Sequence, residues 1–140
     1  MNNNQIVLGF DYGTTNIGVA VCQTALGEAK PLAQLKARDG VPNWDDIAAL
    51  IKEWQPALAI VGLPLNMDGS ESDMCTRARK FARRLNGRFN LATEMMDERL
   101  SSFEAKGDVM RSGGSRDYKH NPIDSIAAKY IIDSWLAARN

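Results

Sequence analysis

The chain has 140 residues, 44% of them hydrophobic and 24% charged, which excludes a disordered protein and fits one domain over residues 1–140. Its 17 basic and 17 acidic residues cancel. That balance excludes a chain-wide electrostatic attraction to nucleic acid, so any such binding must come from a local patch.

The sequence carries no sign of export, membrane insertion or a disulfide framework. Residues 1–5 lack the basic and apolar regions of a signal peptide. No apolar run approaches the roughly 20 residues that a membrane-spanning helix needs. Two cysteines, Cys22 and Cys75, are too few for a disulfide scaffold or a zinc site and are expected to be reduced thiols. We therefore expect a cytoplasmic protein.

The first half of the chain reads as short strands around one helix. Apolar runs separated by turn residues predict strands, and the first three follow one another closely enough to pair antiparallel. A segment whose apolar residues recur every three or four positions predicts a helix, capped by Asn43 and stopped by Pro56. In chain order these elements are strands at residues 5–10, 17–22 and 31–37, a helix at 43–54 and a strand at 57–61.

The second half predicts three helices and one strand. Asn86 and Gly87 are expected to end the first of these helices, because both residues tolerate a left-handed backbone. The closing helix is expected to be capped by Asn121 and to begin at Pro122. The expected elements are a helix at 72–85, a strand at 89–96, a helix at 99–110, a basic loop at 111–120 and the closing helix. The predicted buried stripe of that last helix consists of Ile123, Ala127, Tyr130, Ile131 and Trp135.

This order of elements predicts an α/β fold. Three antiparallel strands are followed by helix, strand, helix, strand and a closing helical segment. One mixed sheet of five strands, its first three antiparallel, with helices on both faces, accommodates that order.

Three acidic residues stand at the ends of elements that are far apart in the sequence. Asp11 ends the first strand, Glu98 follows the fifth, and Asp124 lies in the first turn of the closing helix. Carboxylates placed in this way can converge at one edge of a sheet, where oxygen ligands hold Mg²⁺ or Mn²⁺. Such ions activate water and stabilise the leaving oxygen in phosphodiester hydrolysis. The triple therefore predicts a metal-dependent nuclease with Asp11 as the bridging ligand.

Each of these residues also has a purely structural interpretation. Asp11 could begin a turn, and Asp124 could be an ordinary charge at a helix N-terminus. Glu98 could pair with Arg99. Asp97 competes with Glu98, because neighbours on a strand face opposite ways and only one of the two can face a metal site.

Basic and polar residues supply candidates for binding a nucleic-acid backbone. Six basic residues fall between positions 77 and 88, five of them on the predicted helix at 72–85, although a solvated helix face explains them equally well. The loop at Asn66 could meet a phosphate or could be structural. His120, the single histidine, could assist proton transfer, although a lone loop histidine more often has no chemical role. The residues that we predict to contact nucleic acid are Asn66, Arg77, Lys80, Arg84, Arg99, Arg116, Lys119 and His120.

Four segments resemble the motifs of one protein family. They are residues 11–20 (DYGTTNIGVA), 61–70 (VGLPLNMDGS), 97–102 (DERLSS) and 123–128 (IDSIAA). In this order, and over nearly the whole chain, they are similar to the blocks of the YqgF/RuvX family, RuvC-like members of the ribonuclease H-like superfamily.

The resemblance implies a ribonuclease H-like fold and a nuclease that trims the 5′ end of precursor 16S ribosomal RNA. The implied partner is RNA, as precursor rRNA or as part of a ribosomal particle. One residue departs from the family pattern: Asn16 stands where an arginine is usual next to the metal site. The departure puts a substrate contact in doubt, but it does not affect the predicted fold or carboxylates.

Three other functions compete with this one. A Holliday-junction resolvase acting on branched DNA needs a symmetric dimer. The sequence specifies no dimer interface, and a monomer or weak dimer is expected. Residues 11–16 also resemble the phosphate loop of sugar kinases and actin-like ATPases, but those proteins close two lobes around ATP and 140 residues supply one. A non-catalytic RNA-binding module would use the basic helix alone.

Overall fold

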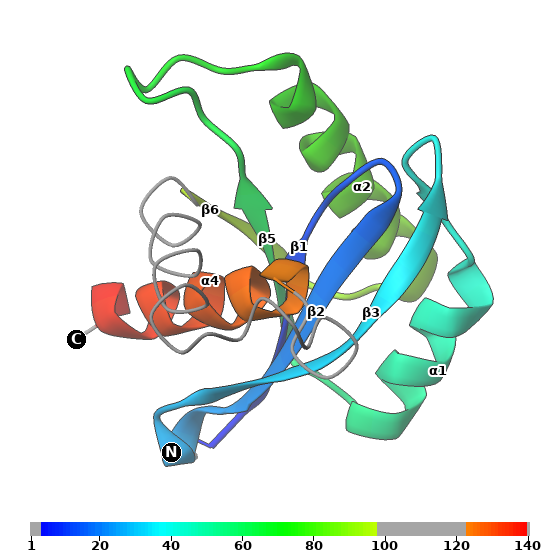
Figure 1. Ribbon diagram of the computed structural model, residues 1–140. Coiled ribbons are helices and arrows are strands. Elements are labelled where there is room, and N and C mark those ends of the chain that lie inside the picture. The colour runs from blue at the N-terminus through cyan, green and yellow to red at the C-terminus, as the bar shows by residue number, and fades with distance from the viewer. Residues whose placement is uncertain (1–3, 98–122, 140) are drawn as a thin grey trace.

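A mixed sheet forms the centre of the computed structural model, which describes residues 4–97 and 123–139 (Figure 1). Within those residues the sheet has six strands in the order β4-β3-β2-β1-β5-β6. The strands are β1 (Ile6–Asp11), β2 (Asn16–Gln23), β3 (Ala29–Arg38), β4 (Val41–Pro42), β5 (Leu58–Leu63) and β6 (Thr93–Asp97).

The pairing of the strands confirms the predicted mixed sheet. Strand β2 pairs antiparallel with both β1 and β3, whereas β5 pairs parallel with β1, and β6 pairs parallel with β5. The predicted number of five strands was wrong by one. The additional strand, β4, pairs with the end of β3 through two residues, Val41 and Pro42. A two-residue edge strand that contains proline shows no alternating pattern from which it could have been predicted.

Helix α1 (Trp44–Trp54) follows its sequence signals closely. The Asn43 side chain accepts a hydrogen bond from the Asp45 backbone N–H at 3.0 Å, which caps the first turn. The helix ends at Gln55, whose φ of 48° is left-handed, and Pro56 follows. The prediction for this helix is confirmed at both ends.

Helix α2 (Asp73–Phe89) is longer than predicted. It continues through Asn86 and Gly87, so the predicted helix end at these residues was wrong, and Phe89 belongs to the helix rather than to a strand. The left-handed residue that ends it is Asn90, with a φ of 52°. Ring contacts of this last turn explain the extension, because Phe89 packs against Trp44 of α1 at 6.2 Å between ring centroids.

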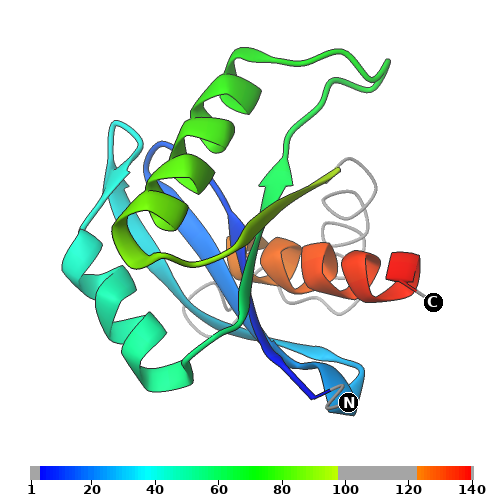
Figure 2. The ribbon, with the colours of Figure 1, turned by 180° about the vertical axis from the view of Figure 1, so that it is seen from behind.

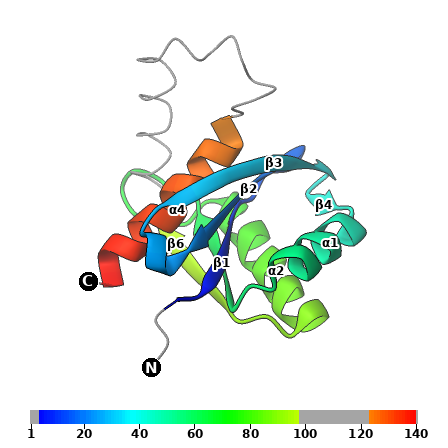
Figure 3. The ribbon, with the colours of Figure 1, turned by 90° about the horizontal axis from the view of Figure 1, so that it is seen from below.

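The helices form a layer on each face of the sheet (Figures 1 and 3). Helices α1 and α2 cover one face and α4 (Ile123–Arg139) covers the other. The core on the α1/α2 face is built around Leu8, Phe10, Val61 and Phe81, and the core on the α4 face around Val7, Ile60, Ile131 and Ile132. Among the described helices, none is long and apolar enough to cross a membrane.

The buried face of α4 is wider than the predicted stripe. Ala127, Ile131 and Trp135 are buried as expected, whereas Tyr130 is only half-buried. Ala128 and Ile132 are buried as well, because the helix lies across β1, β2 and β3 rather than along one strand. The predicted helix at 99–110, the loop at 111–120 and the start of the closing helix at Asn121 and Pro122 lie outside the described residues.

Candidate functional site

Asp11 stands at the carboxyl end of the central strand β1, on the face that α4 covers. Side chains alternate between the faces of a strand, and Val7 and Gly9 of β1 both meet α4. Asp11 shares their face and is half-buried. It pairs with Gly18 of the adjacent strand β2. The predicted central carboxylate therefore stands at the end of the central strand, on the α4 face of the sheet.

The first turn of α4 is held beside this end of the sheet. Ser125 is completely buried, and its Oγ accepts a hydrogen bond from the backbone N–H of Val19 at 3.3 Å. Val19 follows Gly18, the residue that pairs with Asp11. The register between β2 and β3 also shifts at this point, between Ile17 and Val19. Bulges of this kind are frequent next to functional sites.

The hydrogen bond between Ser125 and Val19 also positions the backbone of Asp124, the residue before Ser125 in the chain. Asp124 belongs to the first turn of α4, so its backbone lies near the end of β1 where Asp11 stands. The side chain of Asp124 lies outside the described residues. The fold thus brings together two of the three elements that carry the predicted carboxylates.

Strand β6 shows which face of the sheet one candidate for the third carboxylate, Asp97, belongs to. Met95 packs in the core on the α1/α2 face and Met96 in the core on the α4 face. By strand alternation Asp97 shares the face of Met95, opposite to that of Asp11. Glu98 lies outside the described residues, as do Arg99, Arg116, Lys119 and His120. Among the residues that the structure describes, no group of three His, Cys, Asp or Glu side chains is placed to hold a metal ion.

Asn66 lies in a loop that closes on itself. Its Nδ2 donates to Ser70 Oγ at 3.0 Å, while the N–H and hydroxyl of Ser70 donate to Asp68 Oδ1 at 2.8 and 2.6 Å. The loop projects from the end of the sheet (Figure 2). Helix α2 begins at Asp73, after this loop. The hydrogen bonds favour the structural interpretation of this loop.

Asn16, the departure from the family pattern, opens β2. Its Oδ1 accepts from Gln34 Nε2 at 3.3 Å, and its Nδ2 lies 3.4 Å from Thr15 Oγ1. Gln34 belongs to β3, in the stretch where the register shifts. The Asn16 amide therefore joins the start of β2 to β3.

Three predicted basic residues line one hollow on the other face of the sheet. Arg77, Lys80 and Arg84 follow one another along α2 and border a cavity of about 280 Å³, which we call the basic pocket. Its other lining residues are Tyr12, Asp39, Gly40, Val41, Trp44 and Phe81. The pocket lies between α2, the first turn of α1 and the β3–β4 turn.

Aromatic rings form the floor of the basic pocket. Phe81 lies 5.2 Å from Tyr12 and 5.9 Å from Trp44 between ring centroids, and the Trp44 ring is nearly parallel to it. The guanidinium of Arg88 covers Trp44 at 4.5 Å. Tyr12, Gly40 and Trp44 were not predicted as site residues. An aromatic residue directly after Asp11 and another opening the first helix were the available signals.

Tyr12 ties the first turn to the β3–β4 turn. Its hydroxyl donates to the Gly40 carbonyl at 2.7 Å. Burial raises the pKa of the Tyr12 phenol above its ordinary value, and the positive charge of Arg77 opposes that rise. Gly40 has a φ of 81° and leaves no room for a Cβ beneath the tyrosine hydroxyl.

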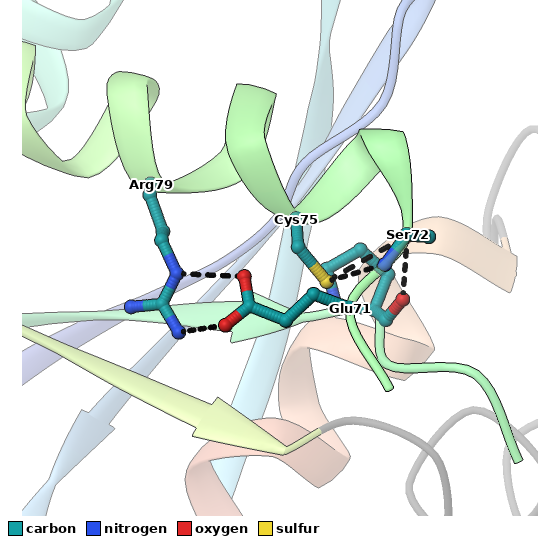
Figure 4. A network of polar contacts seen from close by, with 5 residues as sticks. Glu71, Ser72, Cys75 and Arg79 are labelled. Atoms are coloured by element: carbon teal, nitrogen blue, oxygen red, sulfur yellow. Dashed lines mark hydrogen bonds and ion pairs between the residues drawn. The ribbon is translucent and has the colours of Figure 1, made fainter. Parts of the chain in front are cut away.

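The opposite side of α2 carries a basic residue with a different role. Arg79 donates two hydrogen bonds to the Glu71 carboxylate, at 3.1 and 3.0 Å, and so ties the helix to the preceding loop (Figure 4). Beside it, the Ser72 N–H donates to Cys75 Sγ at 3.4 Å. The basic cluster of α2 is thus divided between a structural contact and the lining of the basic pocket.

Comparison with known proteins matches this architecture. The family model described as RuvX, Holliday junction resolvase, matches residues 5–138. A protein of Pseudomonas fluorescens named "Putative pre-16S rRNA nuclease" is 58% identical over 133 residues, which cover 94% of this chain and 92% of the relative. A protein of Pseudomonas putida with the same name is 55% identical over 139 residues, 99% of both chains.

Solved structures show the same fold at low identity. RuvC of T. thermophilus in complex with a Holliday junction substrate has a TM-score of 0.59 and 16% identity, over 96% of this chain and 95% of that one. The fowlpox virus resolvase with Holliday junction DNA has a TM-score of 0.57 and 18% identity, over 96% and 98%. The fold is thus that of RuvC-like, ribonuclease H-like resolvases. The chain belongs to the RuvX family.

Proposed function

We propose that this protein is a metal-dependent nuclease that hydrolyses phosphodiester bonds in RNA, with the 5′ end of precursor 16S rRNA as its substrate. The relatives that share more than half of its residues carry the name of that activity. The observation that supports the chemistry is the position of Asp11 at the carboxyl end of β1, with the first turn of α4 tied beside it by Ser125 and Val19.

The donor set fits a hard divalent cation. Asp11, Glu98 and Asp124 would hold Mg²⁺ or Mn²⁺, since carboxylate oxygens are the ligands that these ions prefer. Held there, such an ion would supply an activated water molecule and stabilisation of the leaving oxygen of the phosphodiester. Asp11 supplies a carboxylate from the rigid central strand. Asp124 lies where the dipole of α4 favours the ionised carboxylate.

The test compares cleavage by the wild type and by Asp11→Asn. Labelled single-stranded RNA, precursor rRNA fragments and precursor ribosomal particles are incubated with Mg²⁺, Mn²⁺ or EDTA. We expect metal-dependent cutting that Asp11→Asn abolishes while its circular dichroism stays native. Because the chain has no net charge, we expect the particle to be cut faster than short naked RNA.

Asp97→Asn is the matched control for this experiment. It makes the same chemical change at the end of β6, which β5 separates from β1 in the sheet, and on the face opposite to that of Asp11. We expect it to keep cleavage close to the wild-type rate. Full activity of Asp11→Asn, or loss of activity in Asp97→Asn alone, would contradict the assigned carboxylate.

A second candidate function is resolution of Holliday junctions, favoured by the description of the family model. A resolvase cuts two symmetric strands and therefore needs two copies of the site. Paired, symmetric cutting of a four-way DNA junction by a stable dimer would establish this function instead. If neither RNA nor junction is cut while RNA is bound without metal, the protein is a binding module.

A further inference from the structure

We propose that the basic pocket binds one nucleotide unit of single-stranded RNA, with the phosphate on Arg77, Lys80 and Arg84. The base or ribose would lie against Tyr12 and the exposed part of Trp44, a ring that also contacts Phe81, Phe89 and Arg88. This inference rests on the proposed RNA substrate and adds a binding position on the sheet face opposite to Asp11. Its lining combines the two features that single-stranded nucleic acid requires, cations for the backbone and aromatic surface for the base.

The three cations of the pocket are available for a phosphate. They recur at i, i+3 and i+7 on α2, so they form one stripe, and all three are exposed. Among the described residues, the ion-pair partner of Arg77 is Asp39 at 3.4 Å, in a weak pair whose side chains are 45% and 86% exposed. Among the described residues, Lys80 and Arg84 have no ion pair within 4.0 Å, whereas Arg79 is held by Glu71. Within the described part of the chain, the positive charge of the pocket is therefore offset only by Asp39.

The aromatic floor distinguishes the pocket from a surface that binds phosphate alone. Tyr12 and Trp44 are half-buried and flank the buried Phe81. The hollow of about 280 Å³ has room for more than a phosphate. It is bounded on one side by the β3–β4 turn, which Tyr12 fixes through Gly40. A duplex could reach the cations with its backbone, but its stacked bases could not reach this floor.

The position of Tyr12 relates the pocket to the proposed cleavage site. Tyr12 follows Asp11 directly, and the two residues belong to opposite faces of the sheet at the same end of β1. A strand laid across that end would contact both faces in succession. The pocket would then hold a nucleotide that flanks the scissile phosphate and orient the strand over Asp11.

Replacing Asp39 should change RNA affinity in the opposite direction to replacing one of the pocket's basic residues. Its carboxylate is exposed at the rim of the pocket, where it repels a phosphate and competes for Arg77. Its φ of 48° is left-handed, and asparagine tolerates that conformation as aspartate does. Asp39→Asn therefore removes the negative charge without straining the turn.

The experiment measures binding of a labelled single-stranded oligoribonucleotide by fluorescence anisotropy, in EDTA and with Asp11→Asn as the background so that nothing is cut. We expect Arg84→Gln to weaken binding about fivefold. In Arg84→Gln, the magnitude of the slope of log affinity against log salt concentration should fall by about 0.7. Asp39→Asn should tighten binding about twofold. Arg83→Gln is the matched control, because Arg83 is an exposed arginine of the same helix that does not line the pocket.

Equal losses in Arg84→Gln and Arg83→Gln would show non-specific attraction and overturn the proposal. Equal affinity for a duplex of the same sequence, or weaker binding by Asp39→Asn, would overturn it as well. The cleavage test is separate. If the wild type cuts RNA but Arg84→Gln and Arg83→Gln weaken binding equally, the pocket proposal is overturned and the proposed nuclease activity is supported. If Arg84→Gln weakens binding more than Arg83→Gln but the wild type cuts no RNA, the pocket proposal stands and the proposed nuclease activity is overturned.

Discussion

Gly9 sets how closely α4 approaches the central strand. A Cβ built on Gly9 would lie 2.5 Å from Ile132 Cγ1, 2.8 Å from Ile132 Cδ1 and 3.2 Å from the Ala128 carbonyl oxygen. These separations are shorter than carbon contacts in packed protein interiors. The missing side chain therefore lets the helix lie directly against β1, two residues before Asp11.

We predict that Gly9→Ala lowers the free energy of unfolding by about 1–3 kcal/mol, because the added methyl group overpacks the interface with α4. Urea denaturation measures this. Gly87→Ala is the control, since nothing lies within 4 Å of a Cβ there, and it should stabilise the helix by about 0.5–1 kcal/mol. Relief of the Gly9→Ala effect by Ile132→Ala would confirm the contact, and additive losses would contradict it.

Tyr12 makes stability sensitive to alkaline pH. Its raised pKa means that the folded protein holds the phenolic proton more tightly than the unfolded chain does. The associated stabilisation is complete below the unfolded-state pKa of about 10 and is lost as pH rises through the folded-state pKa.

Tyr12→Phe should therefore show a smaller loss of stability above about pH 10 than wild type. Urea denaturation at a series of alkaline pH values measures the difference. Cys22, whose pKa burial also raises, is present in both proteins and cancels in the comparison. An identical decline in both proteins would show that Tyr12 ionises equally in the folded and unfolded states.

Single residues of the site differed in how well the sequence predicted them. Asp11 was predictable because it directly follows an apolar run and therefore stands at a strand end. Glu98 was predicted as the third carboxylate with Asp97 as a competitor, and the sequence could not assign a face to Asp97, because Met95 and Met96 are both apolar and either could face either core. The basic pocket was not predicted as a unit, since its lining comes from three segments that meet only in the folded chain.

The contact between β2 and α4 is the element-scale feature on which the site depends. Val19 and Ser125 are 106 positions apart in the sequence, and their hydrogen bond is buried. We predict that Ser125→Ala lowers the free energy of unfolding by about 1–3 kcal/mol, because it leaves the Val19 N–H buried without an acceptor. Hydrogen exchange of that amide should accelerate. Unchanged exchange at Val19, together with unchanged stability, would show that another acceptor takes over.

Elements with strong local signals were predicted well, and elements that depend on packing were not. Helix α1 has a cap, a clear apolar face and a terminating proline, and all three act as expected. In α2 the helix-breaking tendency of Asn86 and Gly87, about 1 kcal/mol for a glycine, is offset by tertiary contacts beyond them. Arg88 covers Trp44, and Phe89 packs against the same ring. No local sequence pattern predicts such tertiary contacts.

At the scale of the whole molecule, we propose that residues 1–140 form one domain and act as a monomer. The exposed large apolar side chains among the described residues are Leu26, Val41 and Met67, which belong to three separate segments. Stable homodimers usually bury a continuous apolar patch. The described surface offers no such patch.

Sedimentation analysis over a range of concentrations should therefore give the mass of one chain, 15.4 kDa. A monomer that cuts RNA would separate this protein from junction resolvases, which need two symmetric sites. A concentration-independent dimer would contradict the prediction and bring resolution of four-way junctions forward as the function.

The path of α2 through Asn86 and Gly87 has a consequence for the chemical ageing of the protein. Asparagine before glycine deamidates when the glycine nitrogen can reach the side-chain carbonyl, and asparagine is among the residues most prone to thermal damage. The helix occupies that nitrogen in its backbone ladder, and Asn86 Nδ2 donates to the Leu91 carbonyl at 3.1 Å. The folded protein thus protects a site that unfolding exposes, so isoaspartate at position 86 would record past unfolding of α2.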